Sequence, residues 1–149
     1  MVMKKKILLG VLLGLLLCPI KCQAYQPQKA IEIEYTDAQL LLKVAQAEAG
    51  NQGYYGMWMV MSVVLNRVES EEFPNTIEEV IYQPNQFATA GYLDKIEPSS
   101  DSHYALAMIE SGEVAKNIIA FESVKSNSLE RYFWKAFDFR DHSFYTLKK

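Results

Sequence analysis

The chain has 149 residues and a formal net charge of −3 at pH 7, with 50% hydrophobic and 22% charged residues. This length fits one domain, and the apolar share is large enough for a hydrophobic core. Composition therefore excludes a multidomain or a disordered protein. Part of the apolar share lies in the first 24 residues, which have a different character from the rest.

Residues 1–24 have the organisation of a secretory signal peptide. A run of three lysines precedes an apolar stretch from Ile7 to Ile20, and the segment ends at Ala24 in a form suited to signal peptidase. An uncleaved anchor is the weaker interpretation, because a membrane-spanning helix needs ~20 apolar residues. The residues before Cys18 and Cys22 are not the small ones that precede a lipidated cysteine, which argues against a lipoprotein. We therefore expect a protein secreted to the cell envelope, without membrane contact after cleavage.

Cleavage after Ala24 changes the charge and removes both cysteines. The remaining chain has 11 basic and 18 acidic residues, for a net charge of −7. An acidic surface without a basic cluster argues against nucleic acid as a partner, since that binding relies on Lys and Arg. Without cysteine the exported domain has no disulfide or thiolate chemistry, so packing alone must stabilise it. We expect it to be a monomer.

The first elements follow from helix signals. Residues 25–35 are polar and lack a core pattern, which predicts a spacer, and the domain is expected to occupy residues 36–149. Thr36 and Gln39 have the spacing of a capping box before an apolar run that stops at Gly50, which predicts a helix over 37–49.

The later elements are predicted by the same rules, with a long loop between them. Apolar spacings of three and four predict a buried helix over 54–69, and a capping box at Thr76 predicts a short helix to 83. The loop over 84–98 has few periodic signals, and loops of this length usually have a function. Further predictions are a helix over 99–111 with Tyr104 facing inward, a helix over 129–137, and extended stretches at 117–121 and 144–147.

One acid differs from the others, which lie at helix ends among polar residues. Helical spacing places Glu48 above Val44 and Ala45, on the face that enters the core. Partial burial and the negative end of the helix both favour the protonated form of a carboxyl group, which a general acid at neutral pH requires. A structural acid paired with Arg67 or bonded to backbone amides is equally consistent with the periodicity.

Other catalytic chemistry finds little support in the sequence. His103 and His142 are the only histidines, and neither has the spacing of a zinc motif. No G-x-S-x-G elbow is present. We therefore expect neither a metal nor another cofactor.

Amides and aromatic residues gather after Glu48 and in the long loop. Amides pair with sugar hydroxyl and N-acetyl groups, and aromatic rings cover the apolar face of a pyranose. The residues of this kind are Asn51, Gln52, Tyr54, Tyr55, Asn66, Gln83, Asn85, Gln86, Phe87 and Tyr92.

These residues fall in a recognisable order. The stretch from Ala47 to Gly56, the V-V-L-N-R-V block ending at Val68, and later blocks to Tyr145 resemble the bacterial cell wall hydrolase family of the spore-cortex-lytic enzymes SleB and CwlJ. The resemblance covers about residues 37–146. It implies a mainly α, lysozyme-like domain with minor β structure that cleaves the glycan strands of peptidoglycan, usually as a lytic transglycosylase.

The resemblance also implies roles for particular residues. Glu48 takes the place of the catalytic glutamate, which in a transglycosylase serves first as acid and then as base, so no second carboxylate is obligatory. Asn66 and Arg67 are expected to tie the second helix to a loop or to orient Glu48. The residues expected to contact substrate are Gln52, Tyr54, Asn66, Gln86, Phe87, Tyr92 and Tyr145.

Two positions depart from the family pattern. Gln52 stands where the family often has an acid, and Met57 stands where it often has glutamine. If the acid is catalytic in the family, a non-catalytic wall-binding domain becomes an alternative; if it shapes the groove, Gln52 could keep its hydrogen bonds. An amidase that cuts the peptide from the glycan is a further alternative, although the sequence supplies neither the metal site nor the nucleophile it needs.

Overall fold

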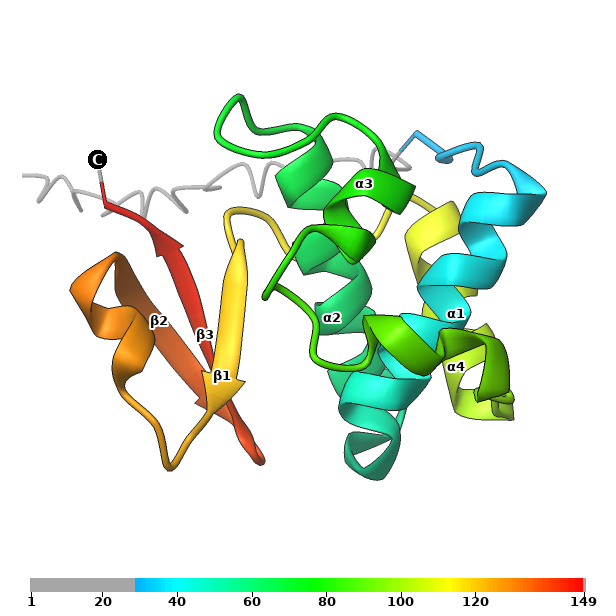
Figure 1. Cartoon of the computed structure of the whole chain (residues 1–149). Helices are drawn as coiled ribbons and strands as arrows, with labels where there is room; N and C mark the ends of the chain where they lie inside the picture. Colours follow the sequence, from blue (N-terminus) through cyan, green and yellow to red (C-terminus); the bar gives the residue numbers. More distant parts are fainter. Residues whose placement is uncertain (1–28, 149) are drawn as a thin grey trace, which may run out of the picture.

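A computed structural model describes residues 29–148, which form a helical half and a small sheet (Figure 1). The α-helices are α1 (Tyr35–Ala49), α2 (Gly53–Val68), α3 (Ile77–Tyr82) and α4 (Ser100–Glu110). Three 3₁₀ helices, η1 (Gly50–Gln52), η2 (Ala90–Lys95) and η3 (Ser128–Arg131), lie between them and the strands. The strands are β1 (Ala120–Ser123), β2 (Phe133–Phe139) and β3 (His142–Leu147).

Helix α2 is the centre of the helical half, and α1, α3 and α4 all pack against it. Its apolar side chains point in most directions, as a helix surrounded by others requires. Val60, Met61 and Val64 are fully buried in one core with Leu41 of α1 and Ile109 of α4. This packing fixes the end of α1, where Glu48 lies.

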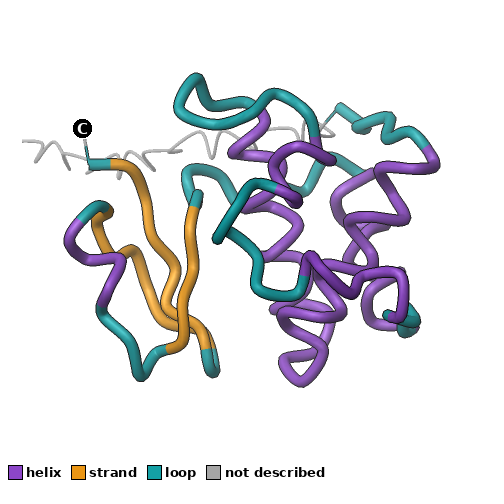
Figure 2. Tube along the Cα trace, in the orientation of Figure 1, coloured by secondary structure: helices purple, strands orange, loops and turns teal. Residues whose placement is uncertain are grey.

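The three strands form an antiparallel sheet in the order β1-β3-β2 beside the helical half (Figure 2). One face of the sheet packs on α2, where Phe144 lies in a second core cluster with Met59, Val63 and Ile118. The other face carries polar side chains. The sheet is therefore attached to the helices through its central strand.

The predicted helix over 129–137 is wrong. Only the short helix η3 forms at its start, and residues 133–139 are strand β2, paired with β3. The segment is rich in aromatic residues, which favour a pleated sheet over a helix. Its partner lies just after it in the chain and is reached through a tight turn, so the hairpin competes successfully with a helix.

The helices of the first half agree with the predicted ranges to within a residue or two, with two corrections. Helix α1 begins at Tyr35 after Glu34, without a side-chain cap, so the capping box predicted at Thr36 does not form. Tyr104 is exposed rather than inward, because α4 turns that side toward Tyr54. The capping box at Thr76 is confirmed, since its hydroxyl accepts a hydrogen bond from the Glu79 amide.

The start of the described chain is attached to the helical half. The Ile31 amide donates to the Glu110 carbonyl, and Ile33 packs against the core, although both lie in the range expected to be a spacer. The expected signal peptide lies outside the described residues. None of the helices between residues 29 and 148 is long and apolar enough to cross a membrane.

Candidate active site

Glu48 lies in the last turn of α1, half-buried, with its carboxylate directed toward the loop between α3 and α4. Its Oε1 accepts a hydrogen bond of 2.6 Å from the Thr89 hydroxyl, 41 residues away in the sequence. Thr89 is 7% exposed, so the donor is fixed by the packing around it. Within the described chain, the other carboxylate oxygen, Oε2, accepts no hydrogen bond from a side chain or from a backbone amide.

The alternative in which Glu48 pairs with Arg67 is wrong, because the two side chains have different partners. Arg67 donates from Nε to the Ile119 carbonyl at 2.6 Å, and its guanidinium lies over the rings of Phe73 and Phe87. Burial lowers the pKa of Arg67 to about 10. Arg67 thus remains a cation at neutral pH and joins α2 to the start of β1.

Asn66 has a similar structural role. Its Nδ2 donates to the carbonyls of Ala115 and Ile118, both at 2.7 Å. This agrees with the expectation that the Asn-Arg pair ties the second helix to a loop. Asn66 also lines a depression at the end of α2.

The turn after Glu48 is held against the β2–β3 hairpin. Gln52 is 2% exposed, and its Nε2 lies 3.0 Å from His142 Nδ1. Asn51 donates to Asp141 Oδ2 at 3.1 Å. Two hydrogen bonds, each across 90 residues of sequence, therefore join the Glu48 turn to the tip of the hairpin.

His142 is a neutral member of this contact. Burial lowers its pKa, and the nearby Asp141 opposes that effect only in part. With the Gln52 amide donating to Nδ1, the proton of the neutral ring lies on Nε2, and Gln52 Oε1 is left buried without a protein partner. Gln52 thus supplies a hydrogen bond at the position where the resemblance implied an acid.

Two glycines let this turn form. Gly53 has φ 69°, in the region that side chains disfavour. A Cβ on Gly56 would lie 2.5 Å from Gln52 Cβ, which is closer than real side chains approach. The buried position of Gln52 therefore depends on the absence of a side chain at residue 56.

We expect Gly56→Ala to lower the free energy of unfolding by about 1–3 kcal/mol, because Gln52 and its turn must move to admit the methyl group. Gly91→Ala is the matched control, since a Cβ there meets nothing within 4 Å, and its effect should stay within about 0.5 kcal/mol. Urea unfolding of the two variants measures the difference. Equal stabilities would contradict the close approach of Gly56 to Gln52.

Phe121 connects the hairpin to the long loop. Its ring centroid lies 4.8 Å from that of His142 and 6.0 Å from that of Phe87. Phe87 is 5% exposed and packs in the helical core, two residues before Thr89. This chain of rings places the long loop, and with it the Thr89 hydroxyl, relative to the sheet.

Exposed aromatic residues flank the turn. Tyr54 is 43% exposed, and its ring packs edge to face against Tyr104 at 4.9 Å and Tyr55 at 6.0 Å. In the long loop Gln86 is exposed and Tyr92 is 44% exposed. Tyr54, Gln86 and Tyr92 thus have surface available for a ligand.

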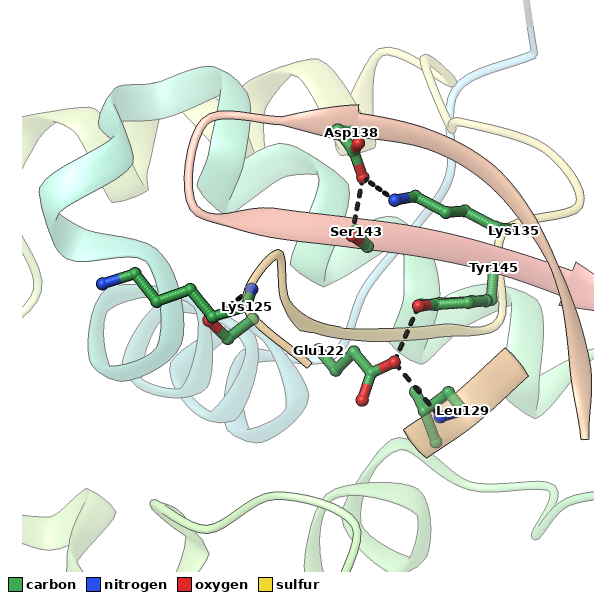
Figure 3. Close-up of polar contacts among 8 residues, drawn as sticks. Glu122, Lys125, Leu129, Lys135, Asp138, Ser143 and Tyr145 are labelled. Carbon is green, nitrogen blue, oxygen red and sulfur yellow. Dashed lines mark hydrogen bonds and ion pairs between the residues drawn. The ribbon is translucent and has the colours of Figure 1, made fainter. Parts of the chain in front are cut away.

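Tyr145 is instead fully buried, on the outer face of the sheet beneath the η3 segment. Its hydroxyl donates to Glu122 Oε1 at 2.7 Å, as Figure 3 shows. Burial and this hydrogen bond raise the pKa of Tyr145 to about 12. Its side chain holds the sheet to η3.

Glu122 is the most heavily hydrogen-bonded acid in the described chain. Burial acts to raise its pKa, but donors from Ser126, Ser128, Tyr145 and the Leu129 amide lower it to about 2. It alternates along β1 with Phe121, which faces the helices, so the two side chains lie on opposite faces of the sheet. Glu122 is therefore a structural anion, unlike the half-buried Glu48 with its single donor.

Sequence reasoning did not identify Thr89 as a site residue, nor did it predict the Gln52–His142 contact. Thr89 lies in the long loop, whose length indicated a function, but no pattern in the loop distinguishes Thr89 from its neighbours. Thr89 contacts Glu48 only because the loop packs against α1, and local periodicity does not predict such a contact.

The fold is a mainly helical domain with a small sheet. Its candidate site has one half-buried glutamate, neutral hydrogen-bonding groups and exposed aromatic rings. Residues 51–147, about two thirds of the chain, match the model of the Cell Wall Hydrolase family. The chain belongs to this family. The matched range begins three residues after Glu48 and contains the rest of the site.

The chain is similar in sequence to spore cortex-lytic enzymes. It is 41% identical to that of Bacillus cereus over 51 residues, which are 34% of this chain and 20% of the relative. It is 35% identical to that of Oceanobacillus iheyensis over 71 residues, which are 47% of this chain and 26% of the relative. The chain therefore aligns with only about a fifth to a quarter of the length of these relatives.

Two solved structures have the same fold. The catalytic domain of the Bacillus cereus SleB protein superposes with a TM-score of 0.67 at 22% identity, covering 77% of this chain and 93% of that one. The catalytic domain of the germination-specific lytic transglycosylase SleB from Bacillus anthracis gives 0.66 at 24% identity, covering 76% and 97%. The expected mainly α, lysozyme-like fold is thereby confirmed.

Proposed function

We propose that this protein is an exported peptidoglycan lytic transglycosylase in which Glu48 is the single catalytic acid and base. The observation that carries the proposal is the half-buried Glu48 carboxylate, whose Oε1 is held by the Thr89 hydroxyl and whose Oε2 has no hydrogen-bond partner among the described residues. Family membership supports the cell wall as the site of action. The similarity to enzymes described as cortex-lytic supports peptidoglycan as the substrate.

In the proposed reaction, the proton of Glu48 Oε2 passes to the glycosidic oxygen that leaves C1 of N-acetylmuramic acid. The carboxylate so formed then takes the proton of the C6 hydroxyl while that oxygen bonds to C1, which closes a 1,6-anhydro ring and restores the acid. One carboxyl group thus serves both proton transfers, unlike the paired carboxylates of most glycosidases. The side-chain partner of Glu48 is a hydroxyl and not a second carboxylate, which is consistent with this route.

The surroundings of Glu48 supply contacts for a glycan. Tyr54, Gln86 and Tyr92 have exposed aromatic or amide groups suited to pyranose rings and N-acetyl groups. Gln52, Asn66, Phe87 and Tyr145 are engaged with other parts of the protein, so we assign them structural roles. Neutral contacts of this kind suit an acidic protein acting on an anionic wall.

Product analysis tests the reaction type. Purified protein is incubated with peptidoglycan, and the soluble fragments are identified by mass spectrometry. Fragments ending in 1,6-anhydro-N-acetylmuramic acid are expected. Reducing ends would instead indicate a muramidase, released stem peptides an amidase, and binding without cleavage a non-catalytic wall-binding domain.

Thr89→Val tests how Glu48 is positioned. The change keeps the shape of the side chain but removes the hydroxyl that donates to Oε1, so we expect kcat to fall about 10- to 100-fold with KM nearly unchanged. Thr89→Ser retains the hydroxyl and should recover most of the activity. A change in KM with kcat unaltered would contradict a positioning role for Thr89. Equal decreases of kcat in the Thr89→Val and Thr89→Ser variants would contradict it as well.

A further inference from the structure

The end of α2 opposite the Glu48 turn carries a depression of ≈ 620 Å³ between the helix and the sheet. Its lining includes Asn66, Ser70, Asn117 and Thr146, with the apolar Ile119 and Leu147 below. The exposed ring of Trp134 forms one side. In Figure 1 this is the end of the sheet at which the chain finishes, whereas the Glu48 turn precedes the other end of α2.

A second depression of ≈ 430 Å³ adjoins the first. The two share Asn66, Glu69 and Asn117 in their linings, so they meet around these three residues. Asn66 lies 13 residues after Gly53 on α2, about 20 Å along the helix axis. The joined depressions, called here the α2-end groove, are therefore separate from the carboxylate of Glu48.

Trp134 exposes much of its ring beside the groove, although Lys148 lies over the ring. It is 60% exposed, although a tryptophan of this size is usually covered when nothing binds it. Lys148 Nζ lies 4.7 Å from its ring centroid and donates to the carbonyls of Glu130 and Arg131, which anchors the ammonium group. Thr146 stands directly opposite Trp134 on β3, so a hydroxyl adjoins the ring.

The polar groups of the groove are mainly neutral. Both hydrogens of the Asn66 amide are used by backbone carbonyls, which leaves its oxygen as a fixed acceptor. Asn117 is held with φ 70° at the turn before β1 and contributes a second amide. An exposed indole ring with amides and hydroxyls around it matches a pyranose ring with its hydroxyl and N-acetyl groups.

A third depression, beyond the α2-end groove, offers a contrast. It measures ≈ 830 Å³ and has the exposed Tyr82 in its wall, but three carboxylates, of Glu69, Glu71 and Glu79, line it. Peptidoglycan is itself anionic through its peptide stems, so this surface repels it. The α2-end groove has a single carboxylate, Glu69, and Lys116 in its lining.

We propose that the α2-end groove is a second binding site for N-acetylated glycan, with Trp134 as its stacking platform. The choice of glycan rests on the proposed function. A strand held there stays attached to the protein while Glu48 acts on a different bond or on a neighbouring strand. A protein of net negative charge is not attracted to an anionic wall by electrostatics. Stacking and hydrogen bonds in this groove would hold it there without such attraction.

The test uses the full chain carrying Glu48→Gln, so that the ligand is not cut. Binding of an N-acetylglucosamine hexamer is measured by calorimetry, and retention is measured on sacculi stripped of anionic polymers. We expect Trp134→Ala to weaken both by about tenfold or more, and Trp134→Tyr to keep most of the binding. Tyr82→Ala, which removes an exposed ring from the acidic depression, should change neither.

Equal binding by the Trp134→Ala and Tyr82→Ala variants would overturn the second site, as would failure of the hexamer to bind at all. Retention that disappears when anionic polymers are stripped would also overturn it, because the ligand would then be such a polymer. NMR shifts on adding the hexamer should include the Trp134 indole and the Asn117 amide. Failure of the proposed function is seen separately, as an absence of cleavage by the protein that retains Glu48.

Discussion

Glu48→Gln is expected to reduce the release of soluble muropeptides by about 10²–10⁴-fold, because glutamine neither donates nor takes the proton that the proposed reaction moves. The amide oxygen still accepts from Thr89, so the free energy of unfolding should change by less than about 1 kcal/mol. Fragment release, followed by reversed-phase chromatography, and urea unfolding measure the two quantities on the same sample.

Glu72→Gln is the matched control for charge. Glu72 is exposed in the turn after α2 and away from Thr89, so its variant should keep full activity. A Glu48→Gln protein that folds and still cleaves at the original rate would rule out Glu48 as the acid. In that case Asp141, a carboxylate at the tip of the hairpin, would be the next residue to test as the acid.

The second large effect concerns stability in acid. Glu122 has an ordinary pKa of 4.5 in the unfolded chain and a pKa of about 2 in the folded protein, where four hydrogen-bond donors outweigh its burial. Because solvent partly screens the carboxylate, its ionised form contributes about 1–2 kcal/mol of stability above pH 4.5, which is lost as the pH falls toward 2. We expect Glu122→Gln to remove most of this contribution at neutral pH.

The pH dependence distinguishes this effect from a simple loss of packing. The difference in unfolding free energy between wild type and Glu122→Gln should shrink as the pH falls from about 5 to 2, because the wild-type carboxylate becomes protonated in that window. Glu110→Gln, an exposed acid at the end of α4, should differ little from wild type at either pH. A Glu122→Gln difference that is constant with pH would contradict the ionised network of Figure 3.

Helices and strands were predictable from sequence to different degrees. Helices α1, α2 and α4 have apolar periodicities, and Thr76 and Ser99 supply side-chain caps to α3 and α4 at spacings that are visible in the sequence. The helix predicted over 129–137 is wrong, because most of that range belongs to strand β2, which pairs with β3. Pairing between strands is a tertiary interaction, and it overrides weak local preference.

The candidate site divides in the same way. Glu48 was identifiable because a carboxylate on a core-facing position of a helix is unusual and because local periodicity reveals it. Thr89 and the Gln52–His142 contact were not identifiable, since their partners lie 41 and 90 residues away. Tyr145 was expected at the substrate, and the structure places its hydroxyl on Glu122.

The sequence by itself determined the class of the fold, the family, the mature acidic charge expected after cleavage, and Glu48 as the acid of interest. These properties depend on composition, on helical periodicity and on motifs of adjacent residues, all of which are local along the chain. The tertiary structure alone decided which hydroxyl holds Glu48, that Arg67 does not pair with it, and that Trp134 borders a second groove. Those contacts depend on how loops and strands far apart in the sequence pack together, and no short segment of sequence determines that packing.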